Sequence, residues 1–398
     1  MHQSKPKKAL VVVRSNVAQD PRVRRQIDWL AEEGWQIDSL GFGSHPSSNV
    51  RDHFEVTPAA AWTQSWLGLA VIHTFFSYRA RFRAFAEGQF PAEAARRVRA
   101  GYYDVVIMND THFLPWLSNK RVFGASPQAV RVHIDLHEWF PLEVGGKSRG
   151  KFLMQGYHAW GRRHIAHPVV TSRSVAGGAG PRYAQEFGFV EPAMVRNMPR
   201  FEQQSPSAVN PDRIELIHHG LAAWARGFRE MVDAMRLVDE RFRLTFMLAG
   251  SQQVIRELQD YIGEQSDRVQ IVPPAKMEEL AAAINPYDVE VMFFPPTTFN
   301  LETALPNKLF ESVQGRLAMV SGPTPTMAAV INEHKLGVMS RDWTPQALAE
   351  AINSLAAPMV EQFKRNSDAA AKVLNAEHEK RAFFRAFGED LDASAEVQ

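Results

Sequence analysis

Short apolar runs alternate with segments of helical period along nearly the whole chain, and this alternation limits the possible folds more than any other feature. In the first half the runs predict strands at Ala9–Val13, Ile37–Phe42, Val105–Met108, Val130–Leu136 and Val169–Thr171. In the second half they predict strands at Ile214–His218, Leu244–Leu248, Val269–Val272, Val289–Phe294 and Leu317–Ser321. Because both alternating faces of these runs are apolar, helices should cover the strands on both sides. The pattern predicts βαβ units around parallel sheets, an α/β fold.

A proline-rich segment with little apolar content separates the two sets of strands. The chain has 398 residues, which is enough for two domains at about 150 to 200 residues each. We predict an N-terminal domain over residues 1–198, an interdomain linker over 199–213, a C-terminal domain over 214–374, and a crossover helix with an acidic tail over 375–398. Closure of the domains about the linker is expected to assemble the site.

Composition argues against several classes of protein. The chain carries 45 Lys and Arg against 44 Asp and Glu, and a net charge of +1 argues against nucleic-acid binding through bulk positive charge. The lack of cysteine excludes disulfides, zinc ribbons, iron–sulfur clusters and a thiol nucleophile. The apolar run after the basic start ends at Arg14, too short for a signal peptide, and no apolar run reaches the about 18 residues of a membrane span. We therefore expect a cytoplasmic protein.

The motif richest in chemistry is Pro306-Asn307-Lys308-Leu309-Phe310-Glu311, which follows a predicted strand. A loop that opens a helix after a parallel strand presents free N–H groups and the positive end of the helix dipole, which suit a phosphate. Lys308 adds a charge there, and Glu311, one turn later, is within reach of ribose hydroxyls. A capped helix with both side chains solvated is the alternative.

A second motif of this kind runs from Gly220 to Gly227. Arg226 at the start of the helix could bind a diphosphate through its forked guanidinium group, with Gly227 allowing the backbone to come close. The alternative is a surface arginine beside a turn glycine. Two cations at the openings of two helices favour a shared anionic ligand.

Polar residues also follow two predicted strands of the first half, in Asn109-Asp110-Thr111-His112 and in Asp135-Leu136-His137-Glu138. Open parallel sheets bind ligands at the edge where the strands end, so these residues are site candidates. They could instead cap helices, and Asp135 could accept hydrogen bonds from loop amides. His218-His219, at the end of another strand, lacks a third ligand, so packing in the core or a turn is favoured over a metal site.

The segment 62–99 combines aromatic and basic residues. Its aromatic residues are Trp62, Trp66, Phe75, Phe76, Tyr78, Phe82, Phe85 and Phe90, and its arginines are Arg79, Arg81, Arg83, Arg96, Arg97 and Arg99. Such a composition suits the interface of a membrane with anionic lipids, so attachment at the inner face of the plasma membrane stays open. The alternative is two helices that cover the first sheet, because Leu67, Val71 and Phe75 have the spacing of a core helix.

Five motifs occur in a familiar order. They are Asp20-Pro21-Arg22-Val23-Arg24-Arg25, Asp135-Leu136-His137-Glu138-Trp139-Phe140-Pro141, Arg196-Asn197-Met198-Pro199, Arg226-Gly227, and Leu305-Pro306-Asn307-Lys308-Leu309-Phe310-Glu311. In order and spacing the chain resembles the family-4-type retaining glycosyltransferases of the GT-B fold, over roughly residues 9 to 385. The resemblance implies two Rossmann-like domains whose parallel sheets face each other across a cleft.

The resemblance also implies roles for individual residues. Arg226 and Lys308 would bind the diphosphate of a nucleotide-sugar donor and serve in catalysis with His137, which would lie beside the transferred sugar. Further donor-side residues would be Gly227, Asn307, Asn300, Glu302 and, on the ribose, Glu311. The acceptor side would hold Asp20, Asp110, Asp135 and Glu138. The resemblance also implies that no metal or other cofactor takes part. Positive side chains can stabilise the departing diphosphate, and that phosphate can take the acceptor's proton, so no pair of carboxylates is required.

The chain departs from the family pattern in three places. Leu221 stands where many relatives have an arginine, and Thr303 where they have a glutamate. Ser15-Asn16-Val17-Ala18-Gln19 replaces a glycine-rich loop. These departures leave Asn300 and Glu302 as the candidates for contact with the sugar.

We therefore expect a metal-independent hexosyltransferase that moves a sugar, with retention, to a hydroxyl of a glycan or a lipid-linked acceptor in bacterial polysaccharide assembly. Leu221 and Thr303 leave open a non-catalytic partner protein of the same fold. A sugar-nucleotide epimerase is a further alternative, although no acid/base pair for it can be located in the sequence.

Overall fold

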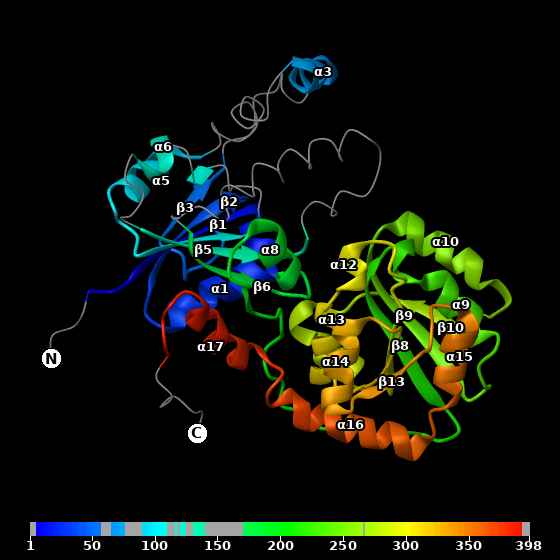
Figure 1. Cartoon of the computed structure of the whole chain (residues 1–398). Coiled ribbons are helices and arrows are strands. Elements are labelled where there is room, and N and C mark those ends of the chain that lie inside the picture. The colour runs from blue at the N-terminus through cyan, green and yellow to red at the C-terminus, as the bar shows by residue number, and fades with distance from the viewer. Residues whose placement is uncertain are drawn as a thin grey trace. The chain divides into compact units, whose positions relative to one another are not determined.

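The computed structural model describes residues 5–56, 65–75, 90–109, 116–117, 120–124, 130–139, 170–265 and 267–391. The chain forms two compact units, one comprising residues 1–195 and 380–398 and the other residues 196–379. Each unit contains a parallel sheet with helices packed on it (Figure 1). Several residues named in the sequence analysis lie outside the described residues. They are Trp62, Phe76 to Glu87, Asp110, Phe140, Pro141 and the tail 392–398.

The first unit is built on a seven-stranded sheet. Its strands are β1 (Lys8–Asn16), β2 (Gln36–Phe42), β3 (Asp52–Glu55), β4 (Val105–Asn109), β5 (Arg131–Leu136), β6 (Val170–Val175) and β7 (Ala193–Met194). They are ordered β3-β2-β1-β4-β5-β6-β7, and all neighbours run parallel. The helices of this unit are α1 (Pro21–Glu32), α3 (Trp66–Phe75), α5 (Ala92–Arg99), α6 (Lys120–Phe123) and α8 (Gly180–Phe187), with a 3-10 turn at Val17–Gln19.

The second unit is built on a six-stranded sheet. Its strands are β8 (Ile214–Ala222), β9 (Phe242–Gly250), β10 (Val269–Val272), β11 (Val289–Met292), β12 (Ala318–Ser321) and β13 (Gly337–Met339), in the order β10-β9-β8-β11-β12-β13. Its helices are α9 (Phe228–Met235), α10 (Gln252–Ile262), α11 (Leu280–Ile284), α12 (Phe299–Glu302), α13 (Asn307–Gln314), α14 (Pro325–His334), α15 (Pro345–Asn353) and α16 (Ala357–Ala371). Short 3-10 turns lie at Trp224–Arg226, Gly263–Gln265 and Met277–Glu279.

The prediction of an α/β fold with two parallel sheets is confirmed. Every predicted strand is present among the described residues, within a few residues of its predicted ends. The strands that the sequence pattern missed, β3, β7 and β13, are short and lie at or beside the edges of the sheets. An edge strand is covered on fewer sides, so it lacks the continuous apolar run by which central strands are identified.

In both sheets the strand order reverses at one point, between β1 and β4 in the first and between β8 and β11 in the second. The loops that leave the two strands at such a point go to opposite faces of the sheet and open a crevice at the carboxyl edge. The residues that end β1, β4, β8 and β11 are therefore placed where a ligand can reach them.

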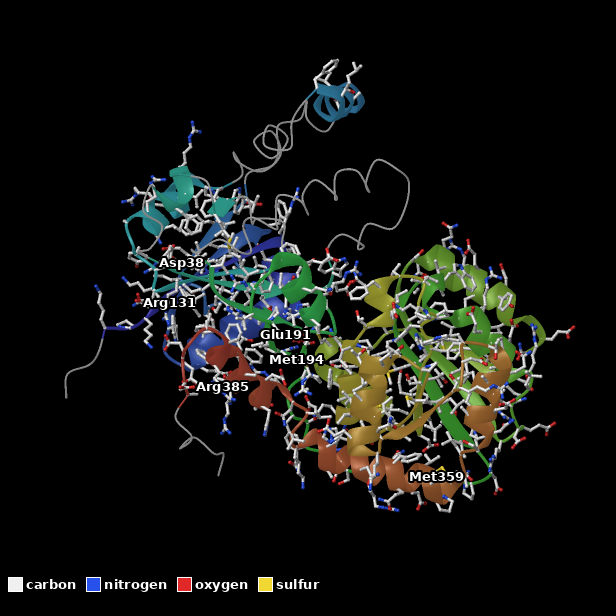
Figure 2. The ribbon with its side chains drawn as sticks, viewed as in Figure 1. Asp38, Arg131, Glu191, Met194, Met359 and Arg385 are labelled. Atoms are coloured by element: carbon white, nitrogen blue, oxygen red, sulfur yellow. The ribbon has the colours of Figure 1, made fainter. Side chains whose placement is uncertain are left out.

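The C-terminal helix α17 (Ala376–Ala386) begins in the second unit and ends in the first. Phe383, Phe384 and Phe387 are buried in the first unit, where their rings meet Trp29 and Trp35. Beyond the helix, Glu389 forms an ion pair with Arg131, with 2.5 Å between oxygen and nitrogen; Figure 2 labels Arg131. The acidic tail is thus bound to the first unit as far as Glu389.

The segment predicted as a linker, 199–213, lies within the second unit and is bonded to it. The backbone oxygen of Glu202 accepts from Arg316 Nη2 at 2.7 Å, and the Ser207 hydroxyl is 2.7 Å from Lys364 Nζ. The two units divide between Val195 and Arg196, three residues before the predicted boundary. A role for the segment in domain closure stays a prediction.

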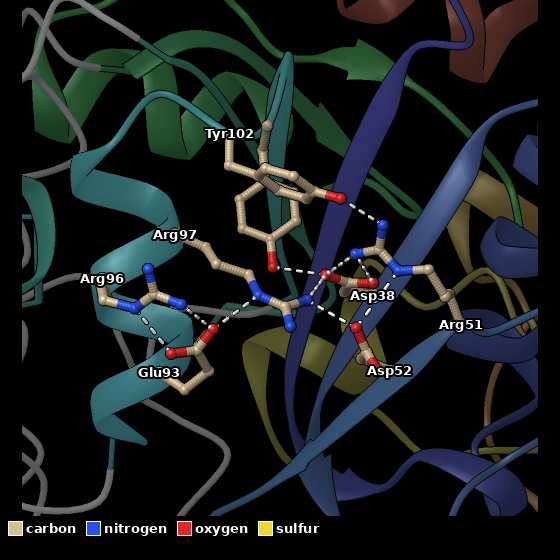
Figure 3. Close-up of polar contacts among 8 residues, drawn as sticks. Asp38, Arg51, Asp52, Glu93, Arg96, Arg97 and Tyr102 are labelled. Atoms are coloured by element: carbon tan, nitrogen blue, oxygen red, sulfur yellow. Dashed lines mark hydrogen bonds and ion pairs between the residues drawn. The ribbon is translucent and has the colours of Figure 1, made fainter.

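The two described helices of the segment 62–99 differ. In α5, Ala94, Ala95 and Val98 are buried, and Arg97 pairs with Asp38, Asp52 and Glu93 (Figure 3). The apolar face of α5 therefore belongs to the core of the first unit, and carboxylates balance the charge of Arg97. In α3, by contrast, Leu67, Val71 and Phe75 share one face and are 67%, 44% and 78% exposed. Among the described residues, no helix is long and apolar enough to cross a membrane.

Candidate functional site

The carboxyl edge of the second sheet, at the reversal between β8 and β11, brings together most of the predicted donor-side residues. Strand β8 ends at Ala222 and leads through the Trp224–Arg226 turn into α9. Strand β11 leads into Phe293 and Phe294, and α13 begins at Asn307. The site is therefore built from a single unit.

Phe294 is the point at which the two predicted cations meet. Lys308 Nζ lies 4.9 Å and the Arg226 guanidinium carbon 5.5 Å from the centroid of its ring. The ring is buried, and a cation over an aromatic face gains electrostatic stabilisation without being neutralised. The structure thus brings Arg226 and Lys308 together, as a shared ligand would require.

Gly227 allows α9 to begin this close to β11. Its φ angle is 73°, and a Cβ atom at this position would lie 2.0 Å from the backbone oxygen of Phe293. Among the described residues, no side chain caps the start of α9 or that of α13, which begins after Pro306. Backbone N–H groups at two helix openings can therefore meet an anion close to both cations.

Lys308 is buried, and its ammonium group lies 3.0 Å from His218 Nε2. His218 Nδ1 lies 2.7 Å from the backbone oxygen of Val291, so it carries the proton and leaves Nε2 as acceptor. Burial, together with Lys308, holds the pKa of His218 well below its usual value. Lys308 therefore donates to a neutral imidazole, which does not balance its charge.

The pKa of Lys308 is lowered to about 7, because burial and the charge of Arg226 outweigh the attraction of Glu290 and Glu311. In the free site this lysine therefore loses its proton far more readily than an exposed lysine does. An anion beside the ammonium group would favour the charged form and raise the pKa again. Lys308 is thus suited to respond to a diphosphate.

Glu311 lies on α13, one turn beyond Lys308, and its Oε2 is 3.0 Å from His219 Nε2. On the other side of the ring, His219 Nδ1 is 2.8 Å from Glu290 Oε2. Burial lowers the pKa of His219, but the two carboxylates outweigh it and raise the pKa to about 9. His219 is therefore an imidazolium ion between two carboxylates at neutral pH.

His218 and His219 are both buried, as the expected core packing requires, but their polar partners were not predicted. A signal was present in β11, whose sequence is Val289-Glu290-Val291-Met292. A carboxylate in the middle of an apolar central strand needs a buried partner. On the neighbouring strand β8, His219 is that partner.

The candidates for the sugar lie on α12, which Thr298 caps by accepting from the backbone N–H of Leu301. Asn300 and Glu302 belong to this helix. The hydroxyl of Thr303 donates to the backbone oxygen of Phe299 at 2.9 Å. Asn307 is exposed as the first residue of α13. Contact of these residues with a sugar stays a prediction.

At the carboxyl edge of the first sheet, Asp135 is the centre of a buried network. Arg22 Nε and Nη2 each lie 2.5 Å from its oxygens, and Gln26 and Ser174 donate to it at 2.6 Å. Burial raises the pKa of Asp135, but Arg22 outweighs it and holds the pKa at about 2. Asp135 therefore stays ionised, with protein donors around both of its oxygens.

His137 follows β5 and lies beside this network. Its Nε2 is 3.3 Å from Asn109 Oδ1 and 3.9 Å from Asp135 Oδ2. The other predicted acceptor-side residues have structural contacts. Asp20 caps α1 and accepts from Ser15 at 2.6 Å, and the backbone oxygen of Glu138 accepts from Tyr183. Their roles toward an acceptor stay predictions.

No group of three or more potential ligands for a metal ion occurs in the part of the chain that the structure describes. The cations of the candidate site are Arg226, Lys308 and the protonated His219.

One family model matches part of the chain. Residues 213–357, which lie in the second unit, match the model for glycosyl transferases group 1. No curated protein sequence matches the chain.

Solved structures resemble the chain along nearly its whole length. A glycosyltransferase from Rickettsia africae is 10% identical with a TM-score of 0.67, and the match covers 96% of this chain and 98% of that one. A sucrose-phosphate synthase from Thermosynechococcus elongatus is 13% identical with a TM-score of 0.69, covering 95% and 98%. Anabaena HepE in complex with UDP is 12% identical with a TM-score of 0.66, covering 95% and 98%. These similarities show the GT-B fold.

Proposed function

We propose that the chain is a glycosyltransferase that moves a sugar from a nucleotide-diphosphate donor to a hydroxyl acceptor. The observation that carries the proposal is the convergence of Arg226 and Lys308 on Phe294, beside two uncapped helix starts in a group 1 glycosyltransferase domain. Transfer breaks the bond between the anomeric carbon and the diphosphate, which leaves with added negative charge. Positive groups held in place at that point lower the barrier.

The acceptor hydroxyl forms the new bond to the anomeric carbon, and its proton passes to the departing phosphate oxygen. This route keeps the reaction on one face of the sugar, so we propose retention, with no metal ion taking part. Arg226 and Lys308 bind the diphosphate and Glu311 binds the ribose. In the first unit, His137 takes part in catalysis. Asp20, Asp110, Asp135 and Glu138 serve the acceptor, which we propose is a glycan or lipid-linked sugar of bacterial polysaccharide assembly.

Binding and turnover test the proposal separately. Calorimetric titration with UDP, GDP, ADP and dTDP should find at least one nucleotide that binds, and its sugar conjugate should be hydrolysed or transferred, with or without EDTA. NMR of the product would give the anomeric configuration. Binding by none of the four would contradict the donor site. Binding without any turnover would instead favour a non-catalytic partner of the same fold.

The exposed face of α3 supports a further proposal, that the chain attaches to a membrane surface near its acceptor. Replacing Leu67 and Phe75 by serine should weaken sedimentation with anionic liposomes, because each apolar side chain contributes by leaving water. Val190→Ser is the matched control, since this residue is 86% exposed on the same unit and lies outside α3. Equal sedimentation of all three proteins would refute membrane attachment through α3.

A further inference from the structure

Behind Glu311 lies a buried ion pair that the transfer reaction as described does not use. His219 on β8 and Glu290 on β11 are almost completely buried, and they are placed on the two strands between which the sheet order reverses. Burying a carboxylate and an imidazolium costs free energy that two apolar residues would not cost. The pair therefore needs an explanation other than stability.

The geometry points to the side chain that the pair holds. Each ring nitrogen of His219 is hydrogen-bonded to a carboxylate. Nδ1 lies 2.8 Å from Glu290 Oε2, and Nε2 lies 3.0 Å from Glu311 Oε2. Since a carboxylate only accepts, both nitrogens must donate, and the raised pKa of His219 agrees with that. Glu311 is thus fixed through one oxygen by a charge-assisted hydrogen bond.

The other oxygen of Glu311 is left for a ligand. The Glu311 side chain is 20% exposed, and no hydrogen bond to its Oε1 occurs among the described residues. A glutamate that is free to rotate would lose side-chain entropy on binding a hydroxyl pair. A glutamate that is already held does not lose that entropy again.

We propose that His219, held in turn by Glu290, is a positioning residue that presents Glu311 Oε1 to the vicinal diol of the donor's ribose. The inference rests on the proposed function, because it requires a nucleotide at this site. It adds the prediction that affinity gained from the ribose hydroxyls depends on two residues that do not touch the nucleotide.

The test compares a nucleotide with its 2′,3′-dideoxy counterpart on three proteins. The nucleotide is the one among UDP, GDP and ADP that binds most tightly in the screen above. The double variant His219→Leu/Glu290→Met removes both buried partners together, so that neither is left as an unpaired buried charge, while the partly exposed Glu311 keeps access to water. Glu290→Gln retains the ring and a hydrogen-bonding partner and serves as the conservative variant.

On the unaltered chain, the dideoxy nucleotide should bind about 10-fold or more weakly, since hydrogen bonds to a charged group are lost. Measured relative to inorganic pyrophosphate, the double variant should lose about 10-fold in affinity for the ribonucleotide and less than about twofold for the dideoxy nucleotide. Glu290→Gln should fall between the two proteins. Pyrophosphate is the reference because Glu290 helps to raise the pKa of Lys308, so its loss can change the diphosphate site for all three ligands alike.

A purely structural role would give a different result, namely an equal loss for the ribonucleotide, the dideoxy nucleotide and pyrophosphate. That result, or no loss at all, would overturn the inference while leaving the proposed function intact. Tightest binding of dTDP, which has no 2′ hydroxyl, would also overturn it. If none of the four nucleotides bound the unaltered chain, the proposed function itself would fail, and this inference with it.

His53→Leu is the control for the removal of a strand histidine. His53 lies on β3 of the first unit and has a partner at each ring nitrogen, the Ser39 hydroxyl at 2.8 Å and the Gly43 oxygen at 2.9 Å. Its replacement should leave the ratio of ribonucleotide to dideoxy affinity unchanged.

Discussion

The carboxyl edges of the two sheets have the same change of strand order, yet their charged side chains are arranged in opposite ways. In the first sheet, Arg22 is bound through two nitrogens to Asp135. In the second, Lys308 donates to the neutral His218, and no ion pair of Lys308 with a carboxylate is found among the described residues. The strand order creates the place for a ligand, whereas the balance of charge decides whether the place attracts an anion.

The largest effect is expected from Arg22→Ala in the first unit. This change leaves Asp135 buried without the cation that compensates its charge, which should lower the free energy of unfolding by about 3–5 kcal/mol. Urea denaturation measures the loss, and Asp135→Asn in the same chain should recover part of it. Nucleotide affinity of the folded variant should not change, and a marked change would break the contrast between the two edges.

Lys308→Met in the second unit should weaken ligand binding and leave stability nearly unchanged, the opposite of Arg22→Ala. It removes a cation from the proposed diphosphate site, so affinity for pyrophosphate and for nucleotides should fall about 30- to 100-fold, or about 2–3 kcal/mol. Because burial lowers the pKa of Lys308, the charged form is unfavourable in the folded state. An apolar replacement removes that cost but also removes the hydrogen bond to His218 Nε2, so stability should change little. Calorimetry and urea denaturation measure the two quantities. Unchanged affinity would rule out Lys308 as a diphosphate ligand.

The pH dependence of nucleotide binding also tests whether Lys308 binds the diphosphate. The pKa of Lys308 is about 7 in the free site and should be higher beside a diphosphate, so binding takes up a proton. Affinity should therefore begin to fall as pH approaches 7 and fall more steeply as pH rises from 7 to 8.5, by at most tenfold per unit, which is about 1.4 kcal/mol. Titrations in buffers of different ionisation enthalpy measure the proton uptake. Lys308→Met should abolish this slope.

The smallest effect is expected when one glycine of each unit is replaced by alanine and the losses of unfolding free energy are compared. Gly34 and Gly227 have nearly equal φ angles, 74° and 73°, but a Cβ atom would meet nothing within 4 Å at Gly34 and would clash with Phe293 at Gly227. Gly34→Ala should cost about 1 kcal/mol of unfolding free energy from the left-handed backbone alone. Gly227→Ala should cost about 1 kcal/mol or more beyond that, and it should also weaken nucleotide binding. Equal costs would show that the close approach of α9 to β11 is unimportant.

Much of the fold followed from local pattern. Central strands such as Ala9–Val13 and Leu244–Leu248 are apolar on both faces because helices cover both, and periodicity detects that directly. The edge strand Asp52–Glu55 is only partly buried, and its sequence of Asp, His, Phe and Glu carries no such signal. Pairing of edge strands depends on the neighbouring strand more than on the sequence of the strand itself.

The candidate site followed from the sequence only in part. Arg226 and Lys308 could be singled out because each follows a strand and opens a helix, although 81 positions separate them in the chain. Their meeting on Phe294 was not predicted, because a cation–π contact leaves no periodicity. The contact of His219 with Glu290 and Glu311 was missed for the same reason.

By itself, the sequence determined the α/β class, the two sheets and which cations stand at helix openings, because hydrophobic period and helix starts are properties of neighbouring residues. Only the tertiary structure decided which charges remain available. Arg22 and Lys308 both lie near the start of a helix, yet one is neutralised by Asp135 and the other faces a neutral imidazole. Electrostatic balance is set by distances across the fold and by burial, and neither is encoded in the spacing of residues along the chain.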